Sequence, residues 1–252
     1  MSSPQAEVQA MLERMTRIRD EAAICTACDL KNTRTHVVFG EGNILSPLVI
    51  VGEGPGEDED SRARPFVGRS GQLLNKILAE AGIKREDVWM TNIVKCRPTG
   101  LNQNNRVTNR PPRASEVKAC QRWLGTELDI IRPRIIIALG NSAASQIIVK
   151  DFKMTTGRGV IAPASGPAIP PSLLPVETGV AGAAVAENQI SMFDTVEATP
   201  QPPALTASTW AMATYHPAYI IRQEEPLLGQ LVQLTVNDLK TALIKLDEIW
   251  KP

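Results

Sequence analysis

Residues 47–60 have the sequence Pro-Leu-Val-Ile-Val-Gly-Glu-Gly-Pro-Gly-Glu-Asp-Glu-Asp, an apolar run followed by an acidic, glycine-rich loop. A continuous apolar run that stops at glycine is typical of a strand buried on both faces of a parallel sheet. In open α/β sheets, ligands bind at the carboxyl ends of such strands. The loop from Gly52 to Asp60 is therefore the first candidate for a functional segment.

Three further apolar segments predict strands, at Val88–Val94, Ile135–Leu139 and Trp210–Tyr215. Apolar residues at helical spacing and local start and stop residues predict helices over 5–23, 70–82, 114–131 and 226–250, and one that begins at Asn141. Because strands alternate with helices, we predict an α/β fold in three layers, α/β/α, around a central four-stranded parallel sheet.

The segment 160–209 interrupts this alternation. It contains eight prolines, four acidic residues and no basic ones. A structureless loop of this length is rare inside a compact domain, so we interpret it as a disordered insertion in a single domain spanning residues 1–252. Without the insertion, Val160-Ile161 would meet Trp210 as a hairpin.

The bulk composition excludes several classes of protein. No run of eighteen apolar residues is present, and the polar N-terminal segment does not resemble a signal peptide, so we expect a cytoplasmic protein. The 27 basic and 27 acidic residues give zero net charge. Contact with nucleic acid would therefore need a local basic patch.

The four cysteines suggest a metal site. Cys25 and Cys28 form a CxxC pair, and Cys96 and Cys120 are the other two. Four thiolates can bind zinc or a [4Fe–4S] cluster. The alternative is a redox pair with two buried cysteines, but a thioredoxin-type CxxC opens a helix after a strand, whereas this one follows a helix. The spacing favours a metal without deciding between zinc and iron–sulfur.

Polar residues also follow three of the predicted strands. Glu53, Asn92 and His216 each stand at or just beyond a strand end, and the chain has only two histidines. Five acidic residues between 52 and 60 would repel phosphate, which argues against a nucleotide-binding loop. By itself the acidic run could be a solvated turn; the convergence of the three strand ends favours a site.

Several segments match one known family in order and spacing. They are Cys25-xx-Cys28, Val37–Asn43, Gly52–Gly56, Arg64–Gly68, Thr91–Pro98, Glu116–Cys120 and His216–Tyr219. Over residues 10–160 and 210–245, the chain resembles the family 4 uracil-DNA glycosylases, the iron–sulfur branch of the uracil-DNA glycosylase superfamily. The resemblance implies a uracil-DNA glycosylase-like fold and a [4Fe–4S] cluster bound by Cys25, Cys28, Cys96 and Cys120.

The resemblance implies an enzyme that starts base-excision repair by hydrolysing the N-glycosidic bond of a flipped-out deoxyuridine. Phe66 would stack on the uracil, and Asn92 would pair with its O4 and N3–H. His216, with the backbone N–H groups of Glu53 and Gly54, would hold the negative charge that develops on uracil. The best-known branch of the superfamily has Asp where this chain has Gly54, so the resemblance does not identify the residue that orients the attacking water. Glu53 is the first candidate, ahead of Glu59 and Asp60.

A related branch traps DNA covalently through a histidine in the loop after the second motif. Here that loop, 97–113, contains no histidine, so we expect a monofunctional enzyme that releases its product. The basic residues of this region are candidates for phosphate contacts with single- or double-stranded DNA. They are Lys95, Arg97, Arg106, Arg110 and Arg113. The alternative is an exposed basic face without function. Tyr219 to Arg222 is the candidate wedge that fills the gap left by the flipped base.

Within the insertion, Gln189-Ile-Ser-Met-Phe193 resembles the pentapeptide by which bacterial repair proteins bind the replication sliding clamp. Gln189, Met192 and Phe193 would be its anchors. The motif is degenerate, so a chance match is the rival interpretation.

For the whole chain, which we expect to be a monomer, the alternatives are a non-catalytic iron–sulfur module that binds DNA and recruits partners, and an enzyme that acts on a free nucleoside.

Overall fold

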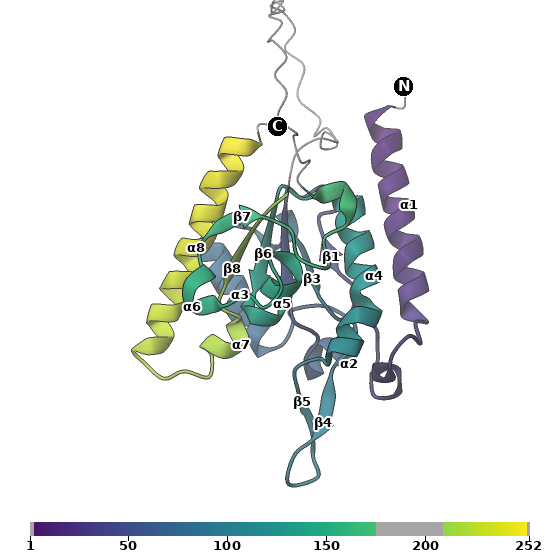
Figure 1. Cartoon of the computed structure of the whole chain (residues 1–252), viewed down its shortest axis with the longest axis vertical. Helices are drawn as coiled ribbons and strands as arrows, with labels where there is room; N and C mark the ends of the chain where they lie inside the picture. The colour runs from purple at the N-terminus through teal and green to yellow at the C-terminus, as the bar shows by residue number, and fades with distance from the viewer. Residues whose placement is uncertain (1–2, 175–208, 251–252) are drawn as a thin grey trace, which may run out of the picture.

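The computed structural model describes residues 3–174 and 209–250, which contain a six-stranded sheet in the order β1-β3-β2-β6-β8-β7 (Figure 1). The four inner strands are parallel: β3 (Trp89–Asn92), β2 (Leu48–Gly52), β6 (Ile135–Leu139) and β8 (Trp210–Thr214). These are the four predicted strands, so the predicted parallel sheet is confirmed.

Each edge of this sheet carries a short antiparallel strand. β1 (Glu41–Gly42) pairs with β3, and β7 (Ile161–Pro163) pairs with β8. The β7–β8 pairing places Ile161 opposite Met212, so the expected approach of Ile161 to the strand that begins at Trp210 is confirmed. The sequence analysis did not predict β1, because two residues are too few to show an alternating pattern.

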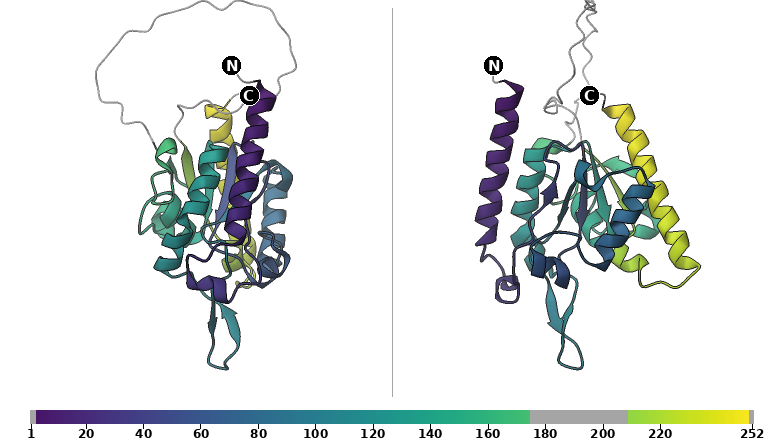
Figure 2. Two further views of the ribbon diagram at one scale, coloured as in Figure 1. Left: turned by 90° about the vertical axis from the view of Figure 1, so that its right-hand side faces the viewer. Right: turned by 180° about the vertical axis from the view of Figure 1, so that it is seen from behind.

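The central strands are apolar on both sides because each face of the sheet is covered by helices. Val49 and Val51 of β2 pack into the core beneath α1 (Pro4–Ala23), α4 (Ala114–Ile131) and α5 (Gly140–Ile147). The alternate residues Leu48 and Ile50 pack into a second core under α3 (Arg69–Glu80) and α8 (Leu227–Ile249). Figure 2 shows the sheet between these two layers, which confirms the three-layer fold.

The predicted long helices are present with nearly the expected bounds, and α1 lies alongside α4 (Figure 2). The remaining helical segments are short: Asp29–Asn32, α2 (Glu57–Arg62), Arg85–Asp87, α6 (Met154–Gly157), Pro171–Leu173 and α7 (Pro217–Ile220). Within the described ranges, no helix combines the length and apolar character needed to span a bilayer.

The basic loop after the second predicted strand forms a hairpin. β4 (Thr99–Leu101) and β5 (Val107–Asn109) pair antiparallel and project from the body of the protein (Figures 1 and 2). The base of the hairpin lies beside the glycine loop, since a Cβ atom added to Gly54 would be 3.4 Å from Pro98 Cδ. The hairpin therefore rises from the same end of the sheet as the candidate site.

The structure differs from expectation in the first part of the segment 160–209. Residues 160–174 form β7 and a turn of 3-10 helix, and Ala168, Ile169 and Leu173 are buried in the core that α4 and α5 cover. Their apolar side chains supply burial that a count of prolines does not reveal. The rest of the expected insertion, 175–208, lies outside the described residues.

Candidate functional site

Two of the predicted site residues meet above the end of β2. Gly52 pairs with Asn92 in the parallel ladder, which sets the two strand ends side by side. A Cβ atom on Gly52 would lie 2.5 Å from Asn92 Oδ1 and 2.7 Å from Phe66 Cζ. The amide oxygen and the aromatic ring thus occupy the space that any larger residue at position 52 would fill.

The side chain of Asn92 has an unsatisfied acceptor. The residue is only 2% exposed, and within the described residues its Oδ1 has no hydrogen-bond partner. A buried acceptor left unpaired costs about 1–3 kcal/mol. The position of this oxygen next to an aromatic ring is suited to a planar ligand that brings an N–H donor.

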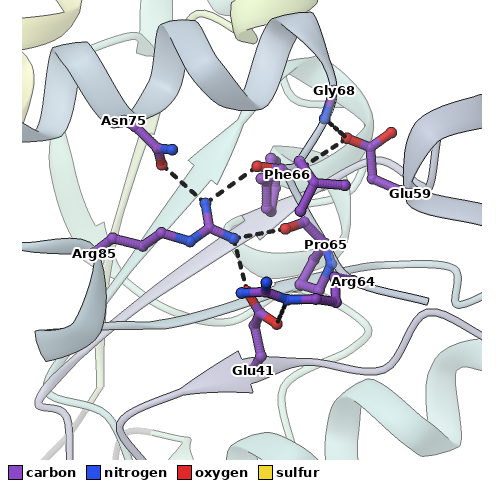
Figure 3. Close-up of polar contacts among 9 residues, drawn as sticks. Glu41, Glu59, Arg64, Pro65, Phe66, Gly68, Asn75 and Arg85 are labelled. Carbon is purple, nitrogen blue, oxygen red and sulfur yellow. Dashed lines mark hydrogen bonds and ion pairs between the residues drawn. The ribbon is translucent and has the colours of Figure 1, made fainter. Parts of the chain in front are cut away.

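Phe66 is held in an unusual backbone conformation. Its φ of 54° lies in the left-handed region, which bulky residues rarely adopt. Such a conformation costs about 1–3 kcal/mol and persists only where the surrounding structure imposes it. The ring lies beside Gly52 and Asn92. Polar contacts to the backbone of Phe66 hold the residue in this conformation (Figure 3).

His216 is a neutral imidazole with a defined tautomer. Its Nδ1 accepts a hydrogen bond of 3.0 Å from the backbone N–H of Ala218 in α7, so the proton resides on Nε2. Burial, and then the positive charge of Arg222, lower the pKa of His216 to about 4. At neutral pH the residue is therefore a donor through Nε2–H without carrying a charge.

His216 also lies at the carboxyl edge of the sheet. A Cβ atom on Gly140, the residue that follows β6, would be 3.2 Å from His216 Cβ. Glu53 is connected to the same neighbourhood, because Ser142 Oγ of α5 donates a hydrogen bond to Glu53 Oε2. Ser142 is not among the predicted site residues, although its place just after the third strand end is a signal for it.

The other carboxylates of the acidic loop have structural roles. Glu59 accepts hydrogen bonds from the backbone N–H groups of Gly56, Val67 and Gly68. Asp60 accepts them from the N–H groups of Thr35 and His36. Both carboxylates are buried and committed to the backbone, so the structure leaves Glu53 as the better candidate for orienting water.

All four cysteines line one small cavity. Cys25 follows α1, Cys28 caps the first 3-10 turn, Cys96 follows β3 and Cys120 lies in α4. Arg34, Lys95 and Trp123 are among the other residues that line the cavity. They are free thiols. Within the described ranges, no three His, Cys, Asp or Glu side chains are grouped to hold a single metal ion.

Hydrogen bonds from cationic and backbone groups reach the sulfur atoms. Lys95 N donates to Cys120 Sγ at 3.2 Å, and Arg34 Nη1 donates to Cys96 Sγ at 3.4 Å. Burial raises the pKa of the Cys120 thiol to about 12 and also raises that of Cys96. Burial alone would raise the pKa of Cys25 too, but hydrogen bonds from Ala27, Trp123 and Arg122 outweigh it and lower the pKa.

The prediction that Lys95 contacts DNA is wrong. Its side chain is 1% exposed, and its ammonium group lies 2.6 Å from Glu127 Oε2. It also donates to Thr91 Oγ1 and, at 3.0 Å, to the backbone oxygen of Asn92. The lysine turns inward because Glu127 offers a charged partner inside the protein, and it cannot reach a phosphate.

The other predicted DNA contacts divide into two groups. Arg110 makes two hydrogen bonds with Glu116 and lowers the pKa of that carboxyl, and Arg97 lies 3.5 Å from Glu57 Oε2. The exposed members are Arg106, Arg113, Tyr219 and Arg222. These exposed residues are more available to nucleic acid than Arg110 and Arg97, which are paired with acidic side chains. Gln189, Met192 and Phe193 lie outside the described residues.

Comparison with known proteins gives one family match and several relatives. The model of the uracil DNA glycosylase superfamily matches residues 39–240. A type-4 uracil-DNA glycosylase of Thermotoga maritima is 46% identical over 148 residues, 58% of this chain and 73% of the relative. The type-4 uracil-DNA glycosylase of Archaeoglobus fulgidus is 42% identical over 146 residues, 58% of this chain and 69% of the relative. That of Sulfurisphaera tokodaii is 39% identical over 140 residues, 55% of this chain and 60% of the relative.

Proposed function

The chain belongs to the uracil DNA glycosylase superfamily, and we propose that it removes uracil from DNA by hydrolysing the N-glycosidic bond of deoxyuridine, the first step of base-excision repair. The observation that carries the proposal is the unpaired Oδ1 of Asn92 beside the ring of Phe66. A uracil flipped out of the duplex would stack on Phe66 and donate its N3–H to this oxygen. Cytosine has an acceptor at N3 and would leave the Asn92 oxygen unpaired, so the pocket discriminates against it.

His216 is the residue that we assign to the departing uracil. As the glycosidic bond breaks, negative charge grows on the uracil ring. A neutral imidazole with its proton on Nε2 can donate a hydrogen bond to this charge without protonating the base in the ground state. The backbone N–H groups of Glu53 and Gly54 are the further donors in this proposal, so that the anion meets several fixed dipoles.

Glu53 is the residue that we assign to the attacking water. Its carboxylate is the acidic group at the end of β2, and the hydrogen bond from Ser142 fixes one of its two oxygens. The other oxygen would orient a water molecule toward C1′ of the sugar. Loop 97–113 contains no histidine that could trap the sugar, so the enzyme releases its product and is monofunctional.

The four cysteines fit a [4Fe–4S] cluster, which we propose as the resident cofactor. Four thiol side chains distributed around one cavity suit a polynuclear cluster, because each thiolate binds a separate iron atom. The N–H donors of Lys95 and Arg34 are placed to stabilise thiolate charge. When bound, the cluster would join the segment after α1 to α4 and to the segment after β3.

For the DNA, we propose contacts with the exposed cations Arg106 and Arg113, supported by Arg97, Arg110 and Arg222. Tyr219, 43% exposed and stacked on Tyr215, is the candidate wedge. The pentapeptide Gln189–Phe193 remains a proposed sliding-clamp ligand that rests on its sequence. Replacing Gln189 and Phe193 by Ala should abolish clamp capture and leave activity on short oligonucleotides intact; unchanged capture would contradict the idea.

The function is tested with purified holoprotein and an oligonucleotide that contains one deoxyuridine. Strand cleavage by alkali after incubation reports an abasic site, and the matched deoxycytidine oligonucleotide is the control. We expect cleavage of the first and none of the second. A folded, iron-containing protein that binds both oligonucleotides but produces an alkali-labile site in neither would instead support a recruitment module.

A further inference from the structure

Arg85 makes the contacts that fix the backbone around Phe66. Its Nη2 donates to the carbonyl oxygen of Pro65 at 2.7 Å, and its Nη1 donates to that of Phe66 at 3.2 Å (Figure 3). One planar guanidinium therefore bridges the two consecutive carbonyls on either side of the Phe66 N–Cα bond. This bridge spans the torsion that has the left-handed value of 54°.

The guanidinium is itself held by two further side chains. Asn75 Oδ1 of α3 accepts from Nη1 at 2.9 Å, and Glu41 Oε1 of β1 accepts from Nη2 at 2.8 Å. Glu41 also pairs with Arg64 at 2.9 Å. Burial alone would raise the pKa of Glu41, but its hydrogen bonds to the two arginines outweigh this and lower the pKa. Arg85 thus has a fixed anionic partner.

The chain on the other side of Phe66 is fixed independently. Glu59 Oε1 accepts from the N–H groups of Val67 and Gly68 at 3.0 and 2.8 Å. Gly71 permits the close approach of α3, because a Cβ atom there would be 2.0 Å from the Phe66 carbonyl oxygen. An arginine therefore holds the carbonyls of Pro65 and Phe66, and a glutamate holds the amides of the two residues that follow.

We propose that Arg85 is a positioning residue for pyrimidine recognition, which acts by holding Phe66 in the left-handed conformation that sets its ring beside Asn92. Arg85 contacts backbone oxygens and the side chains of Asn75 and Glu41, so its effect on substrate passes through Phe66. The inference rests on the proposed function. It adds to the proposed site a residue that would act through Phe66 and would not contact the pyrimidine itself.

The test is a double-mutant cycle of Arg85→Lys and Phe66→Ala, with kcat and KM measured on the deoxyuridine oligonucleotide. Lysine keeps a charge for Glu41 but cannot bridge two carbonyls. We expect Arg85→Lys to raise KM about tenfold, the size of one lost base-stacking contact, with kcat changed less than about twofold. In the Phe66→Ala background the same substitution should change KM less than about twofold. Independent, additive effects would overturn the proposal.

Two further measurements separate positioning from a general loss of structure. Amide hydrogen exchange should accelerate at Val67 and Gly68 in Arg85→Lys and remain unchanged in the central strands; acceleration throughout the sheet would contradict a positioning role. Arg14→Lys, a change in an exposed ion pair between α1 and Asp129, is the matched control and should leave KM and exchange unchanged. Wild-type protein without activity would refute the proposed function, whereas active wild type with an additive cycle would refute only this inference.

Discussion

The Nζ atom of Lys95 lies 2.6 Å from Oε2 of Glu127, and both side chains are almost completely withdrawn from solvent. This ion pair connects two parts of the molecule. Lys95 donates through its backbone N–H to Cys120 and through its ammonium to the carbonyl of Asn92. Glu127 in α4 also accepts from the N–H of Gly40. The cysteine cavity and the proposed pyrimidine site therefore share one buried salt bridge.

Removing one charge of this pair should be costly. We expect Glu127→Gln to lower the free energy of unfolding by about 3 kcal/mol or more, because a buried ammonium is left without its counter-charge. Chemical denaturation of the holoprotein measures the loss. Glu248→Gln, which breaks the exposed pair with Lys245, is the control and should cost less than about 0.5 kcal/mol. Equal losses of unfolding free energy in the two variants would contradict the assignment of Lys95 and Glu127 as a buried ion pair.

Asn92→Ala should remove discrimination along with activity. Two proposed hydrogen bonds to uracil are lost, so kcat/KM should fall by about 30- to 150-fold at about 1–1.5 kcal/mol for each bond. The measurement is single-turnover cleavage of the deoxyuridine oligonucleotide, with iron content and circular dichroism confirming that the variant is intact. A variant with full iron content and wild-type kcat/KM would show that uracil is recognised elsewhere.

The depressed pKa of His216 predicts a pH dependence of stability. The pKa falls from its usual 6.5 to about 4 in the folded protein. Between these two values the unfolded chain binds a proton that the folded chain does not, so the free energy of unfolding should decrease as the pH falls from 6.5 to about 4. His216→Asn should show a shallower decrease over that window.

The tautomer of His216 can be observed directly. Nitrogen-15 NMR at pH 7 should show a neutral ring with its proton on Nε2, as the hydrogen bond from Ala218 requires. A doubly protonated ring at pH 7 would rule out the neutral donor that the mechanism assigns to this residue.

The exposed arginines should control the salt dependence of DNA binding. Arg106→Ala and Arg113→Ala should each reduce the slope of log Kd against log salt concentration by about 1, the loss of one phosphate contact. Fluorescence anisotropy with a labelled oligonucleotide measures the slope. Arg14→Ala, a change on the exposed surface of α1, is the control and should leave the slope unchanged. An unchanged slope in all three would place the DNA on another surface.

Cluster binding is tested by composition. The purified protein should contain about four iron atoms per chain. Cys96→Ala and Cys120→Ala should lose most of the iron and sulfide, since each removes one of four ligands. Stoichiometric zinc in place of iron would support the other metal that the cysteine spacing allows.

The fold could be predicted from local patterns because its main elements are long and regular. The helix 114–131 and the strand Ile135–Leu139 are present with the predicted bounds, since apolar spacing determines both. The two-residue strand β1 is too short to produce such a pattern, whereas the pairing of β7 with β8 follows from joining Val160-Ile161 to Trp210 across the insertion.

The sequence predicts only those site residues that stand at the ends of strands. Glu53, Asn92 and His216 stand at strand ends, and topology alone brings strand ends together. The sequence groups Lys95 with the arginines of the loop 97–113 that follows it, whereas its burial depends on Glu127, which is distant in the sequence. Arg85 was missed for the same reason: its partners lie in different elements and share no motif.

The direction of β8 separates the candidate site from Leu174 and Thr209, the two described residues that flank the segment 175–208. Thr209 leads directly into the first residue of β8. Ser172, two residues before Leu174, donates a hydrogen bond to Asp129 near the end of α4, the helix that leads into β6. Both flanking residues therefore lie toward the amino ends of the parallel strands β6 and β8, whereas His216 follows the carboxyl end of β8. A change in the number of residues between Leu174 and Thr209 would therefore enter the fold at the end of the sheet opposite to Glu53, Asn92 and His216.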